Sequence, residues 1–435
     1  RGLGDVYKRQ VVMLCLKSPI TTKLFTTKLC PLVLAMASVM TVVPSVAAPL
    51  LSTHGDYTFN DSANAYLEVD VQAFEDNILR LQNTLGDSKI CAVMKADAYG
   101  NGIDLLMPSI IKMRVPCVAI ASNEEAKVAR AHGYQGEIVR VRAASIAEIK
   151  NGLPYHIQEL VGDLSHAQAI SELASSVNRP IQYHLALNAG GMDRNGLELA
   201  SDTGKAQALT LLNLPNLQLV GIMTHYAYED EAFVKERLQL FMEQVAWLTD
   251  TAHLDKNKLT LHTANSFATI AVPESHLDMV RVGGLLYGDT IDAKPAYKKI
   301  MQFKSKVASV HFYKAGTTVG YDGLHTLQRD SYLANLPFGY SDGYHRVFTN
   351  KGSVLIAGHR VPVLGKVSMN TTMVDVTDYP DIKAGDEVVI YGKQGDNEIS
   401  QEEIEDINGA LLADLYTVWG NSNPRFIKPA TQSLP

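Results

Sequence analysis

The sequence predicts an α/β protein, a (β/α)8 barrel of the TIM type followed by a mostly-β C-terminal domain. Eight short apolar runs recur between residues 90 and 282, and stretches with helical periodicity separate them. From about residue 300, short runs with β-branched residues alternate with Gly, Asp and Pro turns, which indicates a second domain. An open doubly wound sheet is the alternative for the first domain, but no G-x-G-x-x-G turn follows its first strand.

The predicted elements follow this pattern along the chain. We assign residues 66–300 to the barrel and residues 301–435 to the C-terminal β domain. The predicted barrel strands are Ile90–Met94, Cys117–Ala121, Glu137–Val141, Gln158–Val161, Ile181–Leu187, Leu219–Met223, Lys258–His262 and Met279–Val282. The predicted helices are Val71–Leu85, Asn123–Ala131, Leu164–Ser175 and Glu231–Thr251. The predicted C-terminal strands are Val307–Phe312, Tyr332–Leu336, Val354–Ile356, Val361–Val363, Thr372–Val376 and Glu387–Tyr391.

The composition is that of a soluble globular protein with a sizeable core. Of the 435 residues, 46% are hydrophobic and 20% are charged, and this length suits two domains. The formal net charge of -7 argues against a nucleic-acid binder, which would carry a basic patch. We expect no nucleic-acid partner and no metal site.

The N-terminal residues are interpreted as segments outside the folded domains. Residues 1–12 lack an initiator Met and resemble a translated adaptor, so we expect a sequencing artefact and a start at Met13. Residues 13–47 have the pattern of a secretory signal peptide, with lysines before an apolar run and small residues at the cleavage site. A transmembrane anchor is the alternative, but the run is short and interrupted. An extended segment over 48–65 would then begin an exported, periplasmic chain that is free of the membrane.

Cys91 and Cys117 are the two cysteines that remain after signal removal. Two cysteines in an oxidising compartment are a candidate disulfide. A pair of buried free thiols is the alternative.

Lys95 follows the first predicted strand, in the stretch ICAVMKADAYG. The reactive face of a barrel lies at the carboxyl ends of its strands. Apolar neighbours would desolvate the ammonium, lower its pKa and leave a nucleophilic amine. Position alone also fits a solvated lysine at the end of a strand.

Seven segments in order resemble the alanine racemase family of enzymes that use pyridoxal 5'-phosphate (PLP). ICAVMKADAYGNG resembles the family's A-V-x-K-A-N-A-Y-G-x-G, which contains its cofactor lysine. The other six segments are HLALNAGGMDRNG (184–196), MTHYA (223–227), HTANSFAT (262–269), DMVRVGGLLYGD (278–289), TVGYDG (318–323) and KVSMNTTMVDV (366–376).

The resemblance implies a pair of catalytic bases. Lys95 would hold PLP covalently and act as one base, and Tyr321 from the other subunit would be the second base on the opposite face. Racemisation needs both, because one group removes the α-proton and the other returns it. The resemblance therefore implies a homodimer with shared active sites that acts on free amino acids.

The resemblance also assigns cofactor contacts. Arg281 would face the pyridine nitrogen, which a guanidinium cannot readily protonate. His225 would stack on the ring, and Arg194 would donate to its phenolic oxygen and contact the substrate. The remaining cofactor positions, most of them for the phosphate, are Tyr99, Asn265, Ser266, Gly283, Gly284 and Tyr416.

Departures from the family concern the substrate. Ala186 replaces a lysine that carries a carbamate in the family, and one residue is inserted before Met192. We expect Asn188 with a bound anion such as chloride to orient Arg194 instead. Asn370 stands where the family has Asp, and Met369 would border the substrate entrance from the neighbouring subunit.

The lost carbamate lysine, the predicted export and the cysteine pair together are features in which the chain resembles the broad-spectrum amino acid racemases of Gram-negative periplasms. The leading hypothesis is a PLP-dependent racemase of several amino acids, including Lys, Arg, Met and Ala. An alanine-specific racemase is the alternative. A PLP-dependent decarboxylase is a further alternative, but Arg281 argues against it. A non-catalytic PLP-binding protein is another, but the second domain with Tyr321 argues against it.

Overall fold

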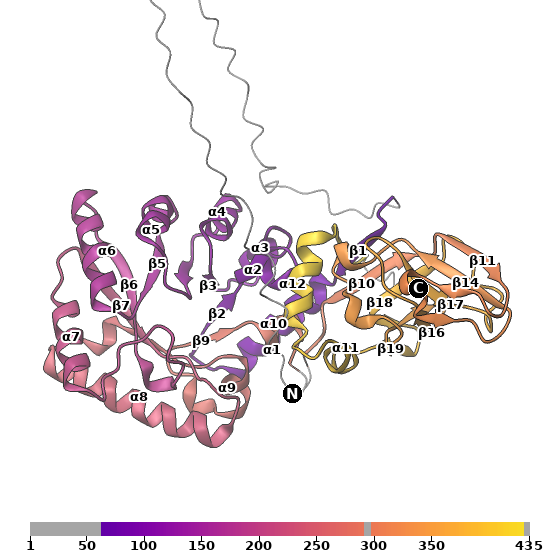
Figure 1. The fold of residues 1–435 in the computed structure, drawn as a ribbon. Helices are drawn as coiled ribbons and strands as arrows, with labels where there is room; N and C mark the ends of the chain where they lie inside the picture. Colours follow the sequence, from indigo (N-terminus) through magenta and orange to yellow (C-terminus); the bar gives the residue numbers. More distant parts are fainter. Residues whose placement is uncertain (1–61, 291–296, 430–435) are drawn as a thin grey trace, which may run out of the picture. The chain divides into compact units, whose positions relative to one another are not determined.

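The structure is a computed structural model that describes residues 62–290 and 297–429. The predicted artefact, the predicted signal peptide and most of the predicted extended segment over 48–65 lie outside the described residues. Figure 1 shows strands β2 to β9 with helices packed around them, and a strand-rich C-terminal part coloured orange to yellow. The predicted fold class is confirmed.

The first domain is a nearly closed barrel of eight strands. The strand order is β8-β7-β6-β5-β4-β3-β2-β9, and every neighbouring pair is parallel. Strands β8 and β9 are not paired as a ladder, but the backbone N–H of Arg281 on β9 donates to the carbonyl of Ala264, just after β8, at 2.9 Å. This hydrogen bond joins the two edges of the barrel sheet. The strands are β2 (Lys89–Val93), β3 (Cys117–Ile120), β4 (Glu137–Arg140), β5 (Ile157–Val161), β6 (Ile181–Ala186), β7 (Leu217–Met223), β8 (Thr260–His262) and β9 (Met279–Val282).

Most of the barrel helices begin where a short polar side chain caps them. Ser122 and Ser145 form capping boxes with Glu125 and Glu148, in which each side chain satisfies an N–H of the first turn. The helices of this domain are α1 (Val71–Thr84), α2 (Lys95–Tyr99), α3 (Ile103–Lys112), α4 (Asn123–Ala131), α5 (Ile146–Gly152), α6 (Leu164–Ser176), α7 (Asp202–Leu212), α8 (Glu231–Thr251), α9 (Ser266–Ala271) and α10 (Gly284–Tyr287).

Successive strand residues face opposite sides of the barrel wall. Cys91 and Cys117 are register partners on β2 and β3, and they form a disulfide with 4.3 Å between their Cα atoms. This confirms the predicted bridge. They pack with Val93, Val139 and Met279, whereas residues such as Ala92 and Val118 join the cluster formed with helices α1 and α3. The disulfide therefore lies inside the barrel, and Cys91 precedes Lys95 on the same strand and its following turn.

The second domain is built on a ten-stranded sheet. Its strand order is β11-β14-β17-β16-β15-β18-β10-β1-β20, with β19 paired to β18, and β12 and β13 form a separate hairpin. Its elements are β10 (Met301–Lys306), β11 (Ser309–Tyr313), β12 (Thr318–Val319), β13 (His325–Thr326), β14 (Ser331–Leu336), β15 (Ser353–Ile356), β16 (His359–Leu364), β17 (Thr372–Asp375), β18 (Glu387–Gln394), β19 (Asn397–Ile399), β20 (Arg425–Ile427), α11 (Gln401–Asn408) and α12 (Ala413–Ser422).

One strand at the start of the predicted barrel range belongs to this sheet. Strand β1 (Ala65–Val69) pairs antiparallel with β10 and parallel with β20, and Leu67 lies opposite both Phe303 and Arg425. Local sequence cannot reveal a pairing over such distances, so the expected ranges of 48–65 and 66–300 divide this strand from its sheet. The described part of the chain thus begins in the second domain, passes through the barrel and returns.

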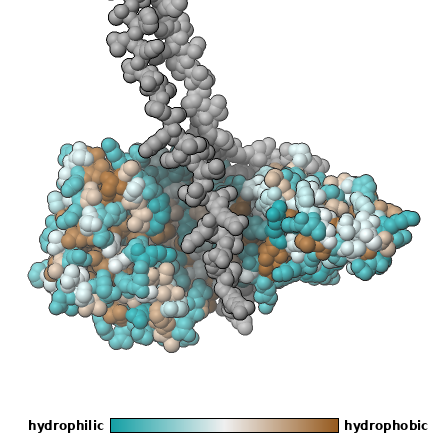
Figure 2. All heavy atoms as spheres, in the orientation of Figure 1, coloured by the Kyte–Doolittle hydropathy of each residue, from teal (hydrophilic) through white to brown (hydrophobic). Residues whose placement is uncertain are grey.

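The surface is that of a folded, largely hydrophilic molecule. On the face shown in Figure 2, hydrophobic residues form small patches among hydrophilic ones. Among the described residues, no helix combines the length and the apolar character needed to cross a membrane.

Candidate active site

A cavity of about 540 Å³ lies at the carboxyl ends of the barrel strands. This volume is in the usual range for small-molecule sites. Of the predicted site residues, it is lined by Lys95, Tyr99, Asn188, Arg194, His225, Asn265, Ser266, Arg281, Gly283, Gly284 and Tyr416. Residues from seven barrel strands or their following loops and from the C-terminal helices thus meet in one place.

Lys95 opens a turn with unusual backbone geometry. The four residues Ala96–Tyr99 all have φ between 53° and 56°, the left-handed region, although none is glycine. This conformation costs on the order of 1–2 kcal/mol for each residue. Such strain persists only where the surroundings impose it, and it is concentrated at functional sites.

Asp97 is the residue through which the surroundings hold this turn. Its N–H donates to Glu125 Oε1 on α4 at 3.2 Å, and its Oδ1 accepts the Ile103 N–H at 2.8 Å. Its Oδ2 forms an ion pair with Arg425 on β20. Contacts from both domains therefore fix the position of the turn that begins at Lys95.

Helix α12 also packs directly on the turn. A Cβ at Gly100 would lie 2.1 Å from the Tyr416 carbonyl oxygen, and a Cβ at Gly420 would lie 2.1 Å from the Gly100 oxygen. Only glycine at these two positions permits this approach of backbone to backbone.

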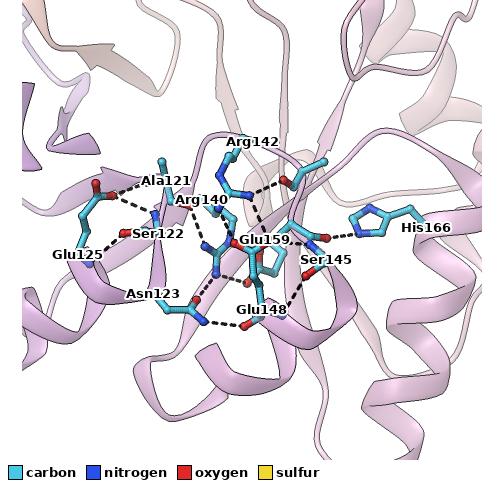
Figure 3. A network of polar contacts seen from close by, with 12 residues as sticks. Ala121, Ser122, Asn123, Glu125, Arg140, Arg142, Ser145, Glu148, Glu159 and His166 are labelled. Atoms are coloured by element: carbon cyan, nitrogen blue, oxygen red, sulfur yellow. Dashed lines mark hydrogen bonds and ion pairs between the residues drawn. The ribbon is translucent and has the colours of Figure 1, made fainter. Parts of the chain in front are cut away.

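Figure 3 shows how the support continues into the barrel wall. Glu125 Oε2 accepts the Ala121 N–H at 2.7 Å, and the Ala121 carbonyl accepts Arg140 Nη1 at 3.0 Å. Arg140 is fully buried and donates through Nε to Glu159 Oε2 at 2.7 Å. Because this ion pair is enclosed and hydrogen-bonded, loss of either partner would leave an uncompensated buried charge.

The electrostatic surroundings of Lys95 favour a free amine. Burial lowers the pKa of Lys95, the charge of Arg194 lowers it further, and Glu125 opposes both effects. Its Nζ lies 5.9 Å from the centre of the Tyr99 ring and makes no hydrogen bond to the described residues. Lys95 therefore reaches into the cavity as an accessible nucleophile or base.

Arg281 lies at the base of the cavity and is almost completely buried. Nη1 donates to the His262 carbonyl at 2.9 Å, and Nη2 donates to the Thr224 carbonyl at 2.8 Å and lies 3.3 Å from His225 Nδ1. Burial lowers the pKa of Arg281 to about 10, so it stays protonated at neutral pH. Burial, followed by the charge of Arg281, lowers the pKa of His225 to about 3 and keeps that ring neutral.

A glycine edge forms another wall. A Cβ at Gly283 would lie 2.4 Å from Tyr99 Oη, and one at Gly284 would lie 2.2 Å from Asp289 Oδ1. Ser266 Oγ accepts the Gly283 N–H at 3.3 Å, while the Asn265 side chain caps α9 by accepting the Ala268 N–H at 2.9 Å. Hydroxyls and bare backbone N–H groups of this kind suit an anion.

Tyr416 lines the same cavity, but its hydroxyl is engaged. It donates to Asp289 Oδ2 at 2.8 Å, and burial raises the pKa of Asp289. The expected phosphate contact of Tyr416 stays a prediction.

The altered segment after β6 is apolar where the family has a charged group. Ala186 is buried and packs with Leu160 and Met223. Asn188 Nδ2 donates to Asp193 at 2.7 Å and to Glu198 at 3.1 Å, so its amide is held by carboxylates. Arg194 makes no ion pair with any described residue, and the anion expected between Asn188 and Arg194 stays a prediction.

Tyr321 and Met369 are not part of the cavity in this chain. Tyr321 is 66% exposed and Met369 is 55% exposed. Lys366 and Asp322 form an ion pair at 2.5 Å, which joins the turn of Tyr321 to the segment before Met369. The second domain therefore displays both side chains on its surface.

Sequence reasoning missed the contribution of α11 and the loop after it. Gln401, Glu405 and Leu411 line the cavity, as does Asp289. Asp289 ends the quoted segment DMVRVGGLLYGD, which was the one available signal. The others come from a region that resembles no motif, so only the folded chain reveals them.

Comparisons with known proteins agree with this geometry. The family model described as the alanine racemase N-terminal domain matches residues 69–291, and the one described as the alanine racemase C-terminal domain matches residues 300–427. A broad specificity amino-acid racemase of Pseudomonas taetrolens is 57% identical over 400 residues, which cover 91% of this chain and 98% of the relative.

Two further proteins extend the comparison. A lysine racemase of Proteus mirabilis is 49% identical over 365 residues, covering 84% of this chain and 89% of the relative. The crystal structure of alanine racemase from Bacillus anthracis with bound L-Ala-P is 25% identical, with a TM-score of 0.78, and covers 84% of this chain and 95% of that chain.

Proposed function

Because the chain belongs to the alanine racemase family and is an amino-acid racemase, we propose that it exchanges the α-proton of several free amino acids with the help of PLP. We propose further that two bases do this in a homodimer, and that the enzyme works in the periplasm. The observation that carries the proposal is the cavity that brings Lys95, Arg281 and the glycine edge together.

The residues present fit PLP. Lys95 offers an amine of lowered pKa for the covalent link, and Gly283 and Gly284 leave an edge that a Cβ would fill. Tyr99 and Ser266 offer hydroxyls beside that edge, and Arg281 lies in the same cavity. The chemistry that PLP supplies when bound is an electron sink that makes the α-proton acidic. Lys95 would then hold or release a proton on one face of the substrate.

The second base is expected from the partner chain. Tyr321 is exposed and does not line the cavity of its own chain, which supports a role in a neighbouring site. In a two-fold dimer, each site would then combine Lys95 of one chain with Tyr321 of the partner subunit. This arrangement makes a dimer necessary for activity.

Subunit complementation tests this proposal. Lys95→Ala and Tyr321→Phe proteins should each be inactive in racemisation, but mixed and reassembled chains should form heterodimers with one intact site. Random mixing should recover about a quarter of the wild-type activity, because half the dimers are mixed and each has one good site. No recovery would contradict shared sites, and full activity of Tyr321→Phe would contradict the role of Tyr321 as the second base.

Broad specificity is supported by the replacement of a charged lysine by Ala186. Ala186, Leu160 and Met223 form an apolar part of the cavity wall. The similarity to a broad specificity amino-acid racemase and to a lysine racemase points the same way. Exchange of solvent deuterium into the α-position of lysine, arginine and methionine, measured beside alanine, tests the range. Exchange with alanine alone would establish the alanine-specific alternative, and release of CO₂ would indicate a decarboxylase.

Periplasmic location is supported by the signal-like residues 13–47 and by the disulfide within the barrel. Disulfides form and persist in oxidising compartments. Cell fractionation of a Gram-negative host that expresses the full chain, with a variant lacking residues 13–47 as control, should place only the full chain in the periplasm. Equal amounts of both proteins in the cytoplasm would overturn this part of the proposal.

A further inference from the structure

A chain of hydrogen bonds runs through the barrel to Arg281 and is buried except at its outer end, where Gln158 is half-buried. Gln158 Oε1 lies 2.8 Å from His184 Nε2, and His184 Nδ1 lies 2.8 Å from His262 Nε2. His262 Nδ1 in turn lies 2.8 Å from Arg281 Nη1. The four residues come from β5, β6, β8 and β9, so the chain crosses the inside of the barrel below the cavity.

The direction of every hydrogen bond in this chain follows from Arg281. A guanidinium only donates, so His262 Nδ1 must accept and its proton must sit on Nε2. That N–H donates to His184 Nδ1, so the proton of His184 also sits on Nε2. The chain ends where the His184 N–H donates to the carbonyl oxygen of Gln158.

Both imidazoles are neutral, as these hydrogen bonds require, because each ring must accept a hydrogen bond at Nδ1. Burial, followed by the charge of Arg281, lowers the pKa of His184 to about 3. Burial is also the largest cause of the lowered pKa of His262, and Arg281 and then His184 lower it further. Neither ring is hydrogen-bonded to a carboxylate among the described residues. Among residues 62–290 and 297–429, Arg281 is the only charged residue hydrogen-bonded to either ring.

Gly221 makes room for this arrangement. It is the register partner of His184 on β7, and a Cβ there would lie 2.3 Å from His184 Nδ1. A larger residue would displace the imidazole from His262. The position therefore requires glycine for a close approach to the ring rather than for backbone freedom.

We propose that Gln158 is a positioning residue that sets the proton arrangement of this chain and thereby aims Arg281 at the cofactor. Among the described residues, the acceptors around Arg281 engage Nη1 and Nη2 but not Nε. The Nε–H is therefore the donor left for a group in the cavity. That this group is PLP rests on the proposed function.

The amide orientation of Gln158 decides between two arrangements. With its oxygen toward His184, every donor in the chain meets an acceptor. With its NH₂ toward His184, both rings would have to carry their protons on Nδ1, and the His262 N–H would face a guanidinium N–H. Arg281 would then have to move, and its Nε–H would lose its direction.

The experiment compares Gln158→Leu, which has no acceptor, with Gln158→Glu, which has only acceptors. Gln182→Leu is the matched control, because this glutamine lies on the neighbouring strand and is exposed. The first measurement is the ¹⁵N NMR spectrum of histidine-labelled protein without cofactor, in which signals are assigned with His184→Asn. Wild type, the control and Gln158→Glu should show protons on Nε2 of both rings, and Gln158→Leu should lose this single pattern at His184.

The second measurement is the affinity for PLP, followed by the quenching of protein fluorescence. It should fall about tenfold in Gln158→Leu and recover in Gln158→Glu, since an unsatisfied buried donor has a cost of this size. Thermal unfolding checks that each variant is folded. An unchanged histidine pattern in folded Gln158→Leu would overturn the positioning role, and this result is independent of whether the racemase proposal holds. A changed pattern without a change in PLP affinity would overturn the link to the cofactor.

Discussion

Arg425 and Asp97 form an ion pair between residues 328 positions apart in the chain. Arg425 lies on the last strand of the second domain, whereas Asp97 lies in the left-handed turn that begins with Lys95. Both side chains are largely buried. The domain that follows the barrel in sequence therefore holds the residue on which the chemistry depends.

Replacing Arg425 with Met should loosen this turn. Asp97 would lose its partner in a partly enclosed place, and we expect the free energy of unfolding to fall by about 1–3 kcal/mol. Racemase activity should fall more than stability alone explains, because Lys95 loses its fixed position. Urea unfolding and turnover measure the two effects. Arg329→Met is the control, because its pair with Asp378 is exposed and should contribute little.

Replacing Arg194 with Leu should raise the pKa of Lys95. Burial is the largest cause of the lowered pKa and will remain, but the repulsion from Arg194 will be lost. The rate at which trinitrobenzenesulfonate modifies Lys95 in cofactor-free protein should therefore rise with pH at higher values than in wild type. The Lys95→Ala protein provides the background rate. A midpoint that moves to lower pH would contradict this account of the electrostatics.

Acid should destabilise the barrel below neutral pH through its buried imidazoles. The pKa of His184 and of His225 is about 3 in the folded protein, well below the ordinary value near 6.5. Between these values the unfolded chain binds more protons than the folded one, so stability is complete above pH 6.5 and declines as the pH falls toward 3. Each imidazole should contribute about 1.4 kcal/mol per pH unit in this window. Unfolding free energies of His184→Asn should depend less steeply on pH than those of wild type.

Removing the disulfide should lower stability without removing the active site. Cys91 and Cys117 are separated by 26 positions, and the loop-entropy model assigns such a bridge about 3.5 kcal/mol. The unfolding temperature of the Cys91→Ala, Cys117→Ala protein should fall, and dithiothreitol should lower that of wild type but not of the variant. If the reductant affects both proteins equally, the bridge is not the source of the stability.

The barrel could be predicted because its signals are local. Each of the eight strands is a short apolar run, and helices such as α4 and α8 have the predicted bounds. Lys95 could be placed at the reactive face for the same reason, since the carboxyl ends of parallel strands meet on one face. The other site residues were predicted from the resemblance of short motifs to those of the family. Strand β1 could not be assigned, because its partners Phe303 and Arg425 are hundreds of residues away.

By itself, the sequence determined the fold class, the position of Lys95 after the first barrel strand and part of the cavity lining, namely the residues in segments that resemble the family's motifs. These follow from periodicity and from short motifs, which depend on neighbours along the chain. Only the tertiary structure decided the left-handed turn of Lys95, the cavity wall from α11 and the hydrogen-bonded chain from Gln158 to Arg281. Each of these depends on contacts between side chains from separate elements, and the free energy of such contacts is set by distance and burial, which the order of residues does not contain.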